Sequence, residues 1–214
     1  DLHELKDDFL EEWPLERVKE MRLDEYTNLN KDDSFCYWLE SRTNDLGSIW
    51  GGSSYKFGIY KRNNTESEVT RTGYQTDGEY SWVSKYGDTK ESAFQTVKES
   101  IINTIEASLH DELKAVDEVD LGNSYKWKIA FLYSDFNVIN IFKTEAIVWV
   151  GKDYGYDLSD RSNFSRIHEY LIAKKPETVD YFDYTSALWK DYETSKLGER
   201  EEEKTKKDGI HRLN

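Results

Sequence analysis

The stretch that decides the fold is residues 88–119, DTKESAFQTVKESIINTIEASLHDELKAVDEV. Its apolar residues recur at spacings of three and four, which is the pattern of a helix with one apolar face. Asp88 followed by Glu91 is a variant of the capping box, so the helix is predicted to begin there and to run to about Val119. We expect one buried stripe along it, formed by Phe94, Val97, Ile101, Ile105, Leu109 and Leu113.

Short segments rich in aromatic and β-branched residues lie on both sides of this helix, and their composition is typical of strands. They are SFCYWLE (34–40), YKFGIYKR (55–62), YSWVSKYG (80–87), YKWKIAFLY (125–133) and NVINIF (137–142). Asn63-Asn64 and Asp77-Gly78 are the expected turns. The sequence therefore predicts an α+β fold, in which a small, mainly antiparallel sheet from residues 34–87 and 125–142 packs against the long helix and terminal helices.

The terminal segments show helical spacing of apolar residues. The predicted helices cover about residues 2–13, 15–21, 144–150, 164–173 and 178–192. We expect residues 1–195 to form a single domain, with a split into two subdomains near Gly122 as the alternative. Residues 196–214 are almost wholly charged and are expected to be a solvated tail or a linker.

Composition excludes several classes of protein for this chain. The 214 residues include 43 acidic and 29 basic ones, for a formal net charge of -14. An aromatic content of 14% argues against disorder. A single cysteine excludes an internal disulfide, and no apolar run reaches the roughly 18 residues of a membrane span. These features predict a cytoplasmic protein that does not bind membranes.

The acidic residues are unevenly distributed along the chain. Residues 1–45 carry 14 acidic and 6 basic residues, and residues 88–120 carry 9 and 3, whereas residues 46–87 carry 4 and 5. The predicted strands are thus neutral to slightly basic. One face of the sheet could therefore meet a polyanion. The alternative is that helices simply display charge while strands are buried.

No motif in the sequence predicts catalysis. It has no G-x-x-x-x-G-K-[ST] loop, no dinucleotide fingerprint and no G-x-S-x-G elbow. No two histidines stand at metal-ligand spacing. Asp153, Asp157 and Asp160 could hold a cation, but their spacing does not fit the EF-hand pattern. We therefore expect a domain with no catalytic residues, no metal and no cofactor.

One segment is aromatic and rich in glycine: LGSIWGGSSYKFGIYKR, residues 46–62. Glycines allow close approach of the backbone, and aromatic rings stack on bases. The residues predicted to contact DNA are Trp50, Tyr55, Lys56, Lys61, Arg62, Arg71, Trp82 and Lys85. The alternative is a tight turn between strands, with Trp50 in the core.

The segments YTNL (26–29), FCYWLE (35–40), LGSIWGGSSYKFGIYKR (46–62), YKWKIAFLYS (125–134) and VINIF (138–142) resemble the N-terminal specificity domain of McrB-like proteins. These are AAA+ subunits of modification-dependent restriction systems. The resemblance implies a non-catalytic domain that recognises DNA, often through a modified base. It also implies two partners, an AAA+ motor domain and a nuclease subunit.

The acidity of this chain departs from the basic face that DNA-binding domains usually show. A protein-interaction or sensor module of an anti-phage defence system is therefore the alternative function. A stand-alone hydrolase has no motif to support it. Binding of modified and unmodified duplexes would discriminate between the first two functions.

Overall fold

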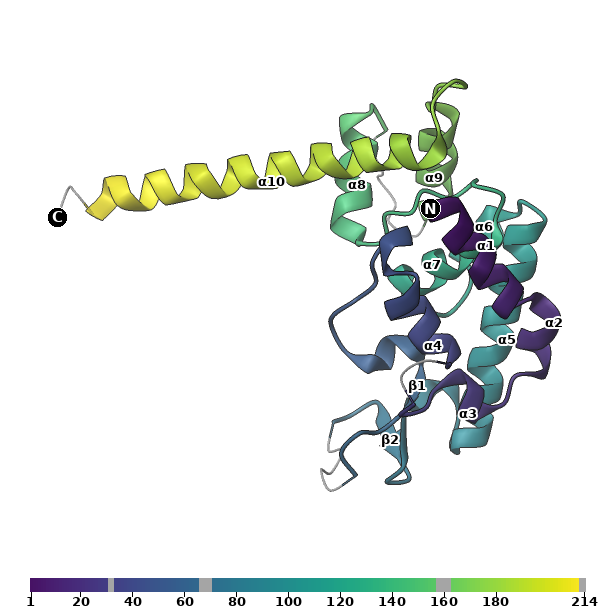
Figure 1. Cartoon of the computed structure of the whole chain (residues 1–214). Coiled ribbons are helices and arrows are strands. Elements are labelled where there is room, and N and C mark those ends of the chain that lie inside the picture. The colour runs from purple at the N-terminus through teal and green to yellow at the C-terminus, as the bar shows by residue number, and fades with distance from the viewer. Residues whose placement is uncertain (31–32, 66–70, 157–162, 212–214) are drawn as a thin grey trace.

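Two helices packed against each other form the middle of the molecule (Figure 1). They are α5, Lys90–Leu109, and α7, Asn123–Tyr133, joined through the short α6, Leu113–Asp117. The computed structural model describes residues 1–30, 33–65, 71–156 and 163–211, and it has the predicted α+β architecture.

The apolar stripe on α5 is confirmed except at its end. Val97, Ile101 and Ile105 are fully buried, whereas Leu109 is 52% exposed. The predicted continuation to Val119 is wrong, because α5 ends at Leu109 and the chain turns through Asp111, whose φ is +58°.

The residues that begin α5 also differ from the prediction. The N-cap is Thr89 rather than Asp88. The Thr89 hydroxyl accepts a hydrogen bond from the Ser92 amide at 3.1 Å, and the Ser92 hydroxyl accepts one from the Thr89 amide at 3.1 Å. This reciprocal pair is a capping box that satisfies two backbone donors at the start of the helix.

Within the described ranges, three strands form a small antiparallel sheet at one end of α5. They are β1, Ile59–Lys61; β2, Tyr74–Thr76; and β3, Tyr80–Val83, in the order β1-β3-β2. Ile59 pairs with Trp82 and both are buried, on the side of the sheet that packs on α5. Asp77 and Gly78 make the predicted turn between β2 and β3, where the Asp77 carboxylate accepts the Tyr80 amide at 2.7 Å.

The other helices come from both ends of the chain. The N-terminal ones are α1, Leu2–Glu12; α2, Leu15–Glu20; α3, Leu23–Tyr26; and α4, Phe35–Tyr37. α4 continues as the π-helical turn η1, Trp38–Arg42, and the 3-10 turns are η2, Asn44–Leu46; η3, Ser54–Phe57; and η4, Ser84–Tyr86. The C-terminal ones are α8, Thr144–Asp153; α9, Phe164–Ala173; and α10, Tyr181–His211.

Two segments predicted as strands are helical. Residues 34–40 lie in α4 and η1, and residues 125–133 lie in α7. Every side chain of α7 from Tyr125 to Tyr133 is buried. A helix buried on all sides has no polar face, so its sequence does not show the helical period.

The predicted strand 137–142 is an irregular segment that pairs with no strand among the described residues, and side chains bond part of its backbone. His168 Nδ1 accepts the Ile139 amide at 3.1 Å, and the Tyr181 hydroxyl donates to the Val138 carbonyl at 2.6 Å. The Ser124 hydroxyl donates to the Phe142 carbonyl at 2.7 Å. Burial lowers the pKa of His168 to about 3, so its ring is neutral and can accept this bond. These bonds replace a β-ladder.

α10 leaves the body of the molecule as a long straight helix (Figure 1). Its first turns pack on α8, and Lys196 Nζ lies 2.8 Å from a carboxylate oxygen of Glu145. The side chains from Leu197 to Lys207 are exposed. The charged segment is thus a helix that offers no buried face. No helix among the described residues is long and apolar enough to cross a membrane.

A buried polar cluster joins the N-terminal helices to α7. The Tyr26 hydroxyl donates to the Phe57 carbonyl at 2.6 Å, and it lies 2.6 Å from the Tyr125 hydroxyl. Cys36 is buried beside these two tyrosines, and this burial raises the pKa of its thiol strongly. The thiol is therefore kept in its neutral form.

Candidate functional site

The aromatic, glycine-rich segment forms a surface loop, residues 47–53, between η2 and η3. Trp50 is 77% exposed, the most exposed large apolar side chain described. Gly51 and Gly52 follow it with φ of +95° and +70°, and the space around both is open. The alternative in which Trp50 belongs to the core is therefore wrong.

Lys56 holds this loop in place. Its ammonium donates to the Ile49 carbonyl at 2.8 Å and to the Gly51 carbonyl at 2.9 Å, and it forms an ion pair with Glu40. The two carbonyls lie on either side of Trp50. Lys56 thus fixes the base of the loop from which the indole projects. It is less suited to a phosphate contact, because its donors are already used.

Beside the loop, three tyrosines form an aromatic cluster on the outer face of the sheet. The Tyr55 ring lies 5.1 Å from that of Tyr60 and 3.9 Å from that of Tyr74. The Arg71 guanidinium lies 5.0 Å from the centre of the Tyr74 ring and is exposed. Partial burial together with Tyr55 raises the pKa of Tyr60. This cluster offers stacking surface with one accessible cation.

The other two predicted lysines, Lys61 and Lys85, are also paired with carboxylates. Lys61 forms an ion pair with Glu79, and Lys85 Nζ lies 2.6 Å from an oxygen of Asp120. These bonds raise the pKa of both lysines. A phosphate would have to displace a carboxylate at each position, which reduces the charge available to attract DNA.

Two of the predicted contact residues lie inside the fold. Trp82 is 3% exposed, and its indole N–H donates to the Gly87 carbonyl at 2.9 Å. Arg62 is 6% exposed, and its guanidinium is 3.3 Å from both the Thr76 hydroxyl and the Gly78 carbonyl. The prediction that these two side chains face DNA is therefore corrected: Trp82 packs in the core, and Arg62 holds the β2–β3 turn.

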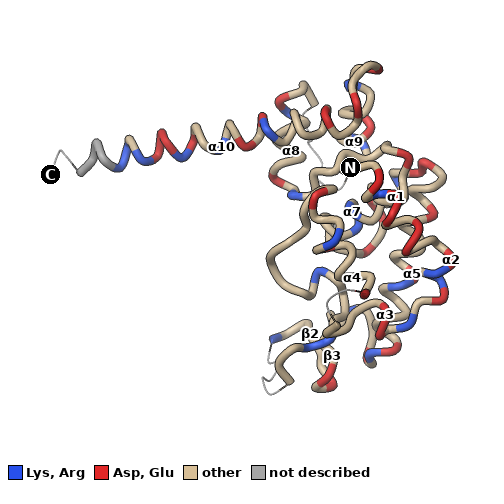
Figure 2. The backbone as a smooth tube through the Cα atoms, in the orientation of Figure 1, with Lys and Arg blue, Asp and Glu red and all other residues tan. Residues whose placement is uncertain are grey.

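Figure 2 shows how charge is distributed over the elements. Acidic residues are frequent on α1, α2 and α5, whereas the loop between η2 and β1 carries few charges. This difference confirms the segmental balance seen in the sequence. The loop around Trp50 therefore repels a polyanion less than α1, α2 and α5 do.

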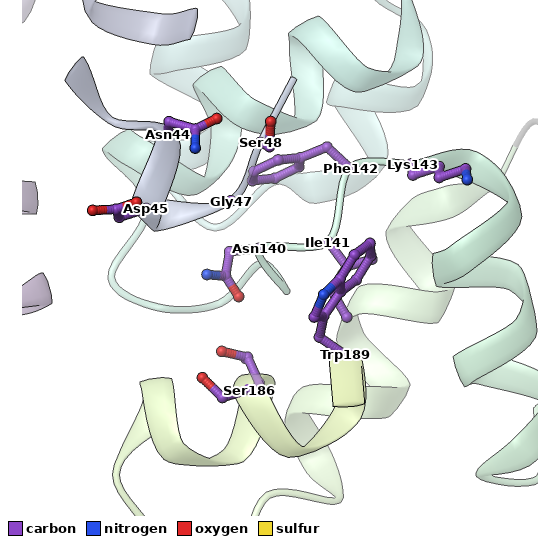
Figure 3. Close-up of a pocket in the computed structure, with 11 residues that line it drawn as sticks. Asn44, Asp45, Gly47, Ser48, Asn140, Ile141, Phe142, Lys143, Ser186 and Trp189 are labelled. Carbon is purple, nitrogen blue, oxygen red and sulfur yellow. The ribbon is translucent and has the colours of Figure 1, made fainter. Parts of the chain in front are cut away.

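A second feature, a cleft of about 310 Å³, was not predicted from the sequence (Figure 3). It lies between residues 44–48, the segment 140–143 and the start of α10. In Figure 3 the Asn140 carboxamide and the Ser186 side chain reach into the gap, while the Trp189 ring stands against Ile141. Three distant segments build the cleft, so no local sequence pattern indicates it.

Lys128 holds one wall of this cleft in place through hydrogen bonds to its backbone. Its ammonium donates to the Thr43 carbonyl at 2.6 Å and to the Gly47 carbonyl at 2.5 Å. Burial lowers its pKa to about 7, and Asp45 opposes that shift. Gly47 has a φ of +113°, and a Cβ there would collide with the Asn140 carbonyl and the Phe142 ring. Only glycine therefore fits between the two walls.

The cleft and the Trp50 loop are neighbours. An open hollow beside Trp50 is lined by Glu40, Ser41, Asn44 and Ser48, and the last two residues also line the cleft. The Trp50 loop and the cleft thus lie next to each other on the surface.

The described residues contain no group of three or more His, Cys, Asp or Glu side chains arranged to hold a metal ion. Asp157 and Asp160, two of the three aspartates considered in the sequence, lie outside the described residues.

Comparisons of the chain with protein-family models, with curated proteins and with solved structures gave no match. The resemblance to McrB-like proteins therefore rests on the sequence segments quoted above.

Proposed function

We propose that this chain is a non-catalytic DNA-recognition domain of a McrB-like restriction system, with Trp50 as its principal contact. The observation that carries the proposal is an indole that is 77% exposed on a loop whose base Lys56 fixes. Tryptophan is enriched at binding interfaces, where its large ring is buried against a partner. Stacking on a base contributes about 1–3 kcal/mol.

The surroundings of Trp50 support a nucleic acid as the partner. Tyr55, Tyr60 and Tyr74 extend the aromatic surface, and Arg71 adds an exposed cation. Because Lys61 and Lys85 are engaged by carboxylates, binding depends on base contacts more than on counterion release. The salt dependence of binding is therefore shallow. By resemblance, a motor domain and a nuclease subunit of the same system would carry out cleavage.

The test is a fluorescence-anisotropy titration of duplexes with and without each common base modification, at two salt concentrations. We expect Trp50→Ala to weaken binding about 5- to 150-fold, the equivalent of the stacking energy. Leu109→Ala is the matched control, since it removes an exposed apolar side chain at the far end of α5. Equal affinity of Trp50→Ala and the parent would exclude this face.

A partner protein is the second candidate, and one observation favours it. The described lysines of the region are ion-paired in a chain of net charge -14, while an exposed tryptophan is a common anchor of protein interfaces. If no duplex binds at either salt concentration, recognition of a protein replaces recognition of DNA.

A further inference from the structure

The cleft between residues 44–48, segment 140–143 and α10 has the properties of a small-molecule site. Its volume of about 310 Å³ lies at the lower end of the range for ligand pockets. Its walls are rigid, since Lys128 bonds one of them and Gly47 packs closely on the other. A preformed cavity avoids the free-energy cost of ordering its walls on binding.

Two aromatic rings form the apolar part of the cleft. Phe142 is buried, whereas Trp189 is 37% exposed although it lies on the part of α10 that packs against the body. Figure 3 shows the Trp189 ring at the edge of the opening. Such surfaces favour a planar ring over a branched aliphatic ligand.

The polar part consists of uncharged donors and acceptors. Asn44 and Ser186 make no side-chain hydrogen bond within the described part of the chain, so their groups are available to a ligand. Asn140 is oriented by the bond from its Nδ2 to the Leu46 carbonyl at 3.0 Å. A carboxamide can contact a base with a donor and an acceptor at once.

The charges around the cleft disfavour a phosphate. Asp45 lines it, and Lys143 Nζ lies 3.8 Å from a carboxylate oxygen of Glu145. The Lys128 ammonium is engaged by two backbone carbonyls. A carboxylate such as that of Asp45 accepts a hydrogen bond from an exocyclic amino group. We propose that the cleft binds a free, uncharged nucleoside whose base carries an exocyclic amino group.

This proposal is independent of DNA binding and is tested by calorimetric titration of the whole chain with adenosine, cytidine, uridine and ribose. We expect adenosine or cytidine to bind about 5- to 150-fold more tightly than uridine, the discrimination given by one good base contact. Ribose alone should not bind. Equal binding of uridine, or no binding of any nucleoside at millimolar concentration, would overturn the proposal.

Two variants locate the site. Asn44→Ala, at an exposed position, and Trp189→Ala should each weaken nucleoside binding at least fivefold, with melting curves recorded to verify folding. Leu109→Ala is the matched control, since it removes an exposed apolar side chain on α5, outside the cleft, and should leave nucleoside binding unchanged. Undiminished binding by a folded Asn44→Ala and a folded Trp189→Ala would place the ligand elsewhere and contradict the proposal.

Discussion

α5 and α7 pack against each other, yet only the sequence of α5 shows the pattern of a helix. α5 has one buried and one exposed face, so its apolar residues recur with the helical period. α7 is buried all around from Tyr125 to Tyr133, and its aromatic residues happen to alternate as they would in a strand. The helical period of apolar residues thus appears only where a helix has one face in the core and another in solvent. A helix that is buried on all sides does not show it.

The largest expected effect is at the centre of α7. Phe131 is fully buried and its ring lies 5.9 Å from that of Tyr181 and 6.0 Å from that of Phe142. Phe131→Ala should lower the free energy of unfolding by about 3–5 kcal/mol, because the cavity cannot collapse among packed rings. Urea denaturation followed by circular dichroism measures it. A loss under 1 kcal/mol would show that α7 is not the core helix.

The stripe on α5 offers an internal comparison. Ile101→Ala should cost about 2–5 kcal/mol, since Ile101 is fully buried. Leu109→Ala, on the same helix, should change stability by no more than about 0.5 kcal/mol, because its side chain is 52% exposed. Similar losses for both variants would mean that Leu109 is covered in solution by another molecule.

Lys128 on α7 makes the stability of the fold depend on pH. Its pKa is about 7 in the folded protein, whereas an unfolded lysine has a pKa near 10.4. Between these values the unfolded state binds the extra proton, so stability rises with pH by up to about 1.4 kcal/mol per pH unit. Below about pH 7 both states are protonated and this gain is lost.

We expect Lys128→Met to flatten the slope of unfolding free energy between about pH 7 and about pH 9. Lys114→Met is the matched control, because Lys114 is exposed on the neighbouring α6. Urea denaturation at each pH provides the slopes. Parallel curves for Lys128→Met and the parent would show that the ammonium keeps its charge throughout.

The outer part of α10 is a third kind of helix, without any buried face. Removing residues 198–214 should change the free energy of unfolding by less than about 0.5 kcal/mol, because the described side chains there are exposed and the Lys196–Glu145 pair is retained. Thermal melting of the truncated protein measures the effect. A drop of many degrees would reveal that these residues pack on something.

These three helices explain how much of the fold was predictable. The helices predicted at 164–173 and 144–150 and the turn at Asp77-Gly78 follow from local patterns and are confirmed. The strand predicted at 80–87 is confirmed only over residues 80–83, because a 3-10 turn follows it. The segment 137–142 was mistaken for a strand because its partners are side chains of residues distant in sequence, such as His168 and Tyr181. No single-sequence pattern encodes such partners.

The candidate site was predictable only in outline. The sequence located the charge-poor aromatic segment, and the loop around Trp50 is exposed. It could not separate Trp50 from Trp82, because both stand in short aromatic segments and only tertiary packing buries one of them. Nor could it show that Lys61 and Lys85 meet Glu79 and Asp120, the second of them 35 residues away.

Cys36 is buried between Tyr26 and Tyr125, so the reactivity of its thiol reports how often this part of the core opens. The chain has one cysteine, and its thiol is out of reach and neutral while the N-terminal helices rest on α7. An alkylating reagent can react only when that junction separates. The rate of modification therefore counts opening events of the core, including those too rare to change any spectroscopic signal.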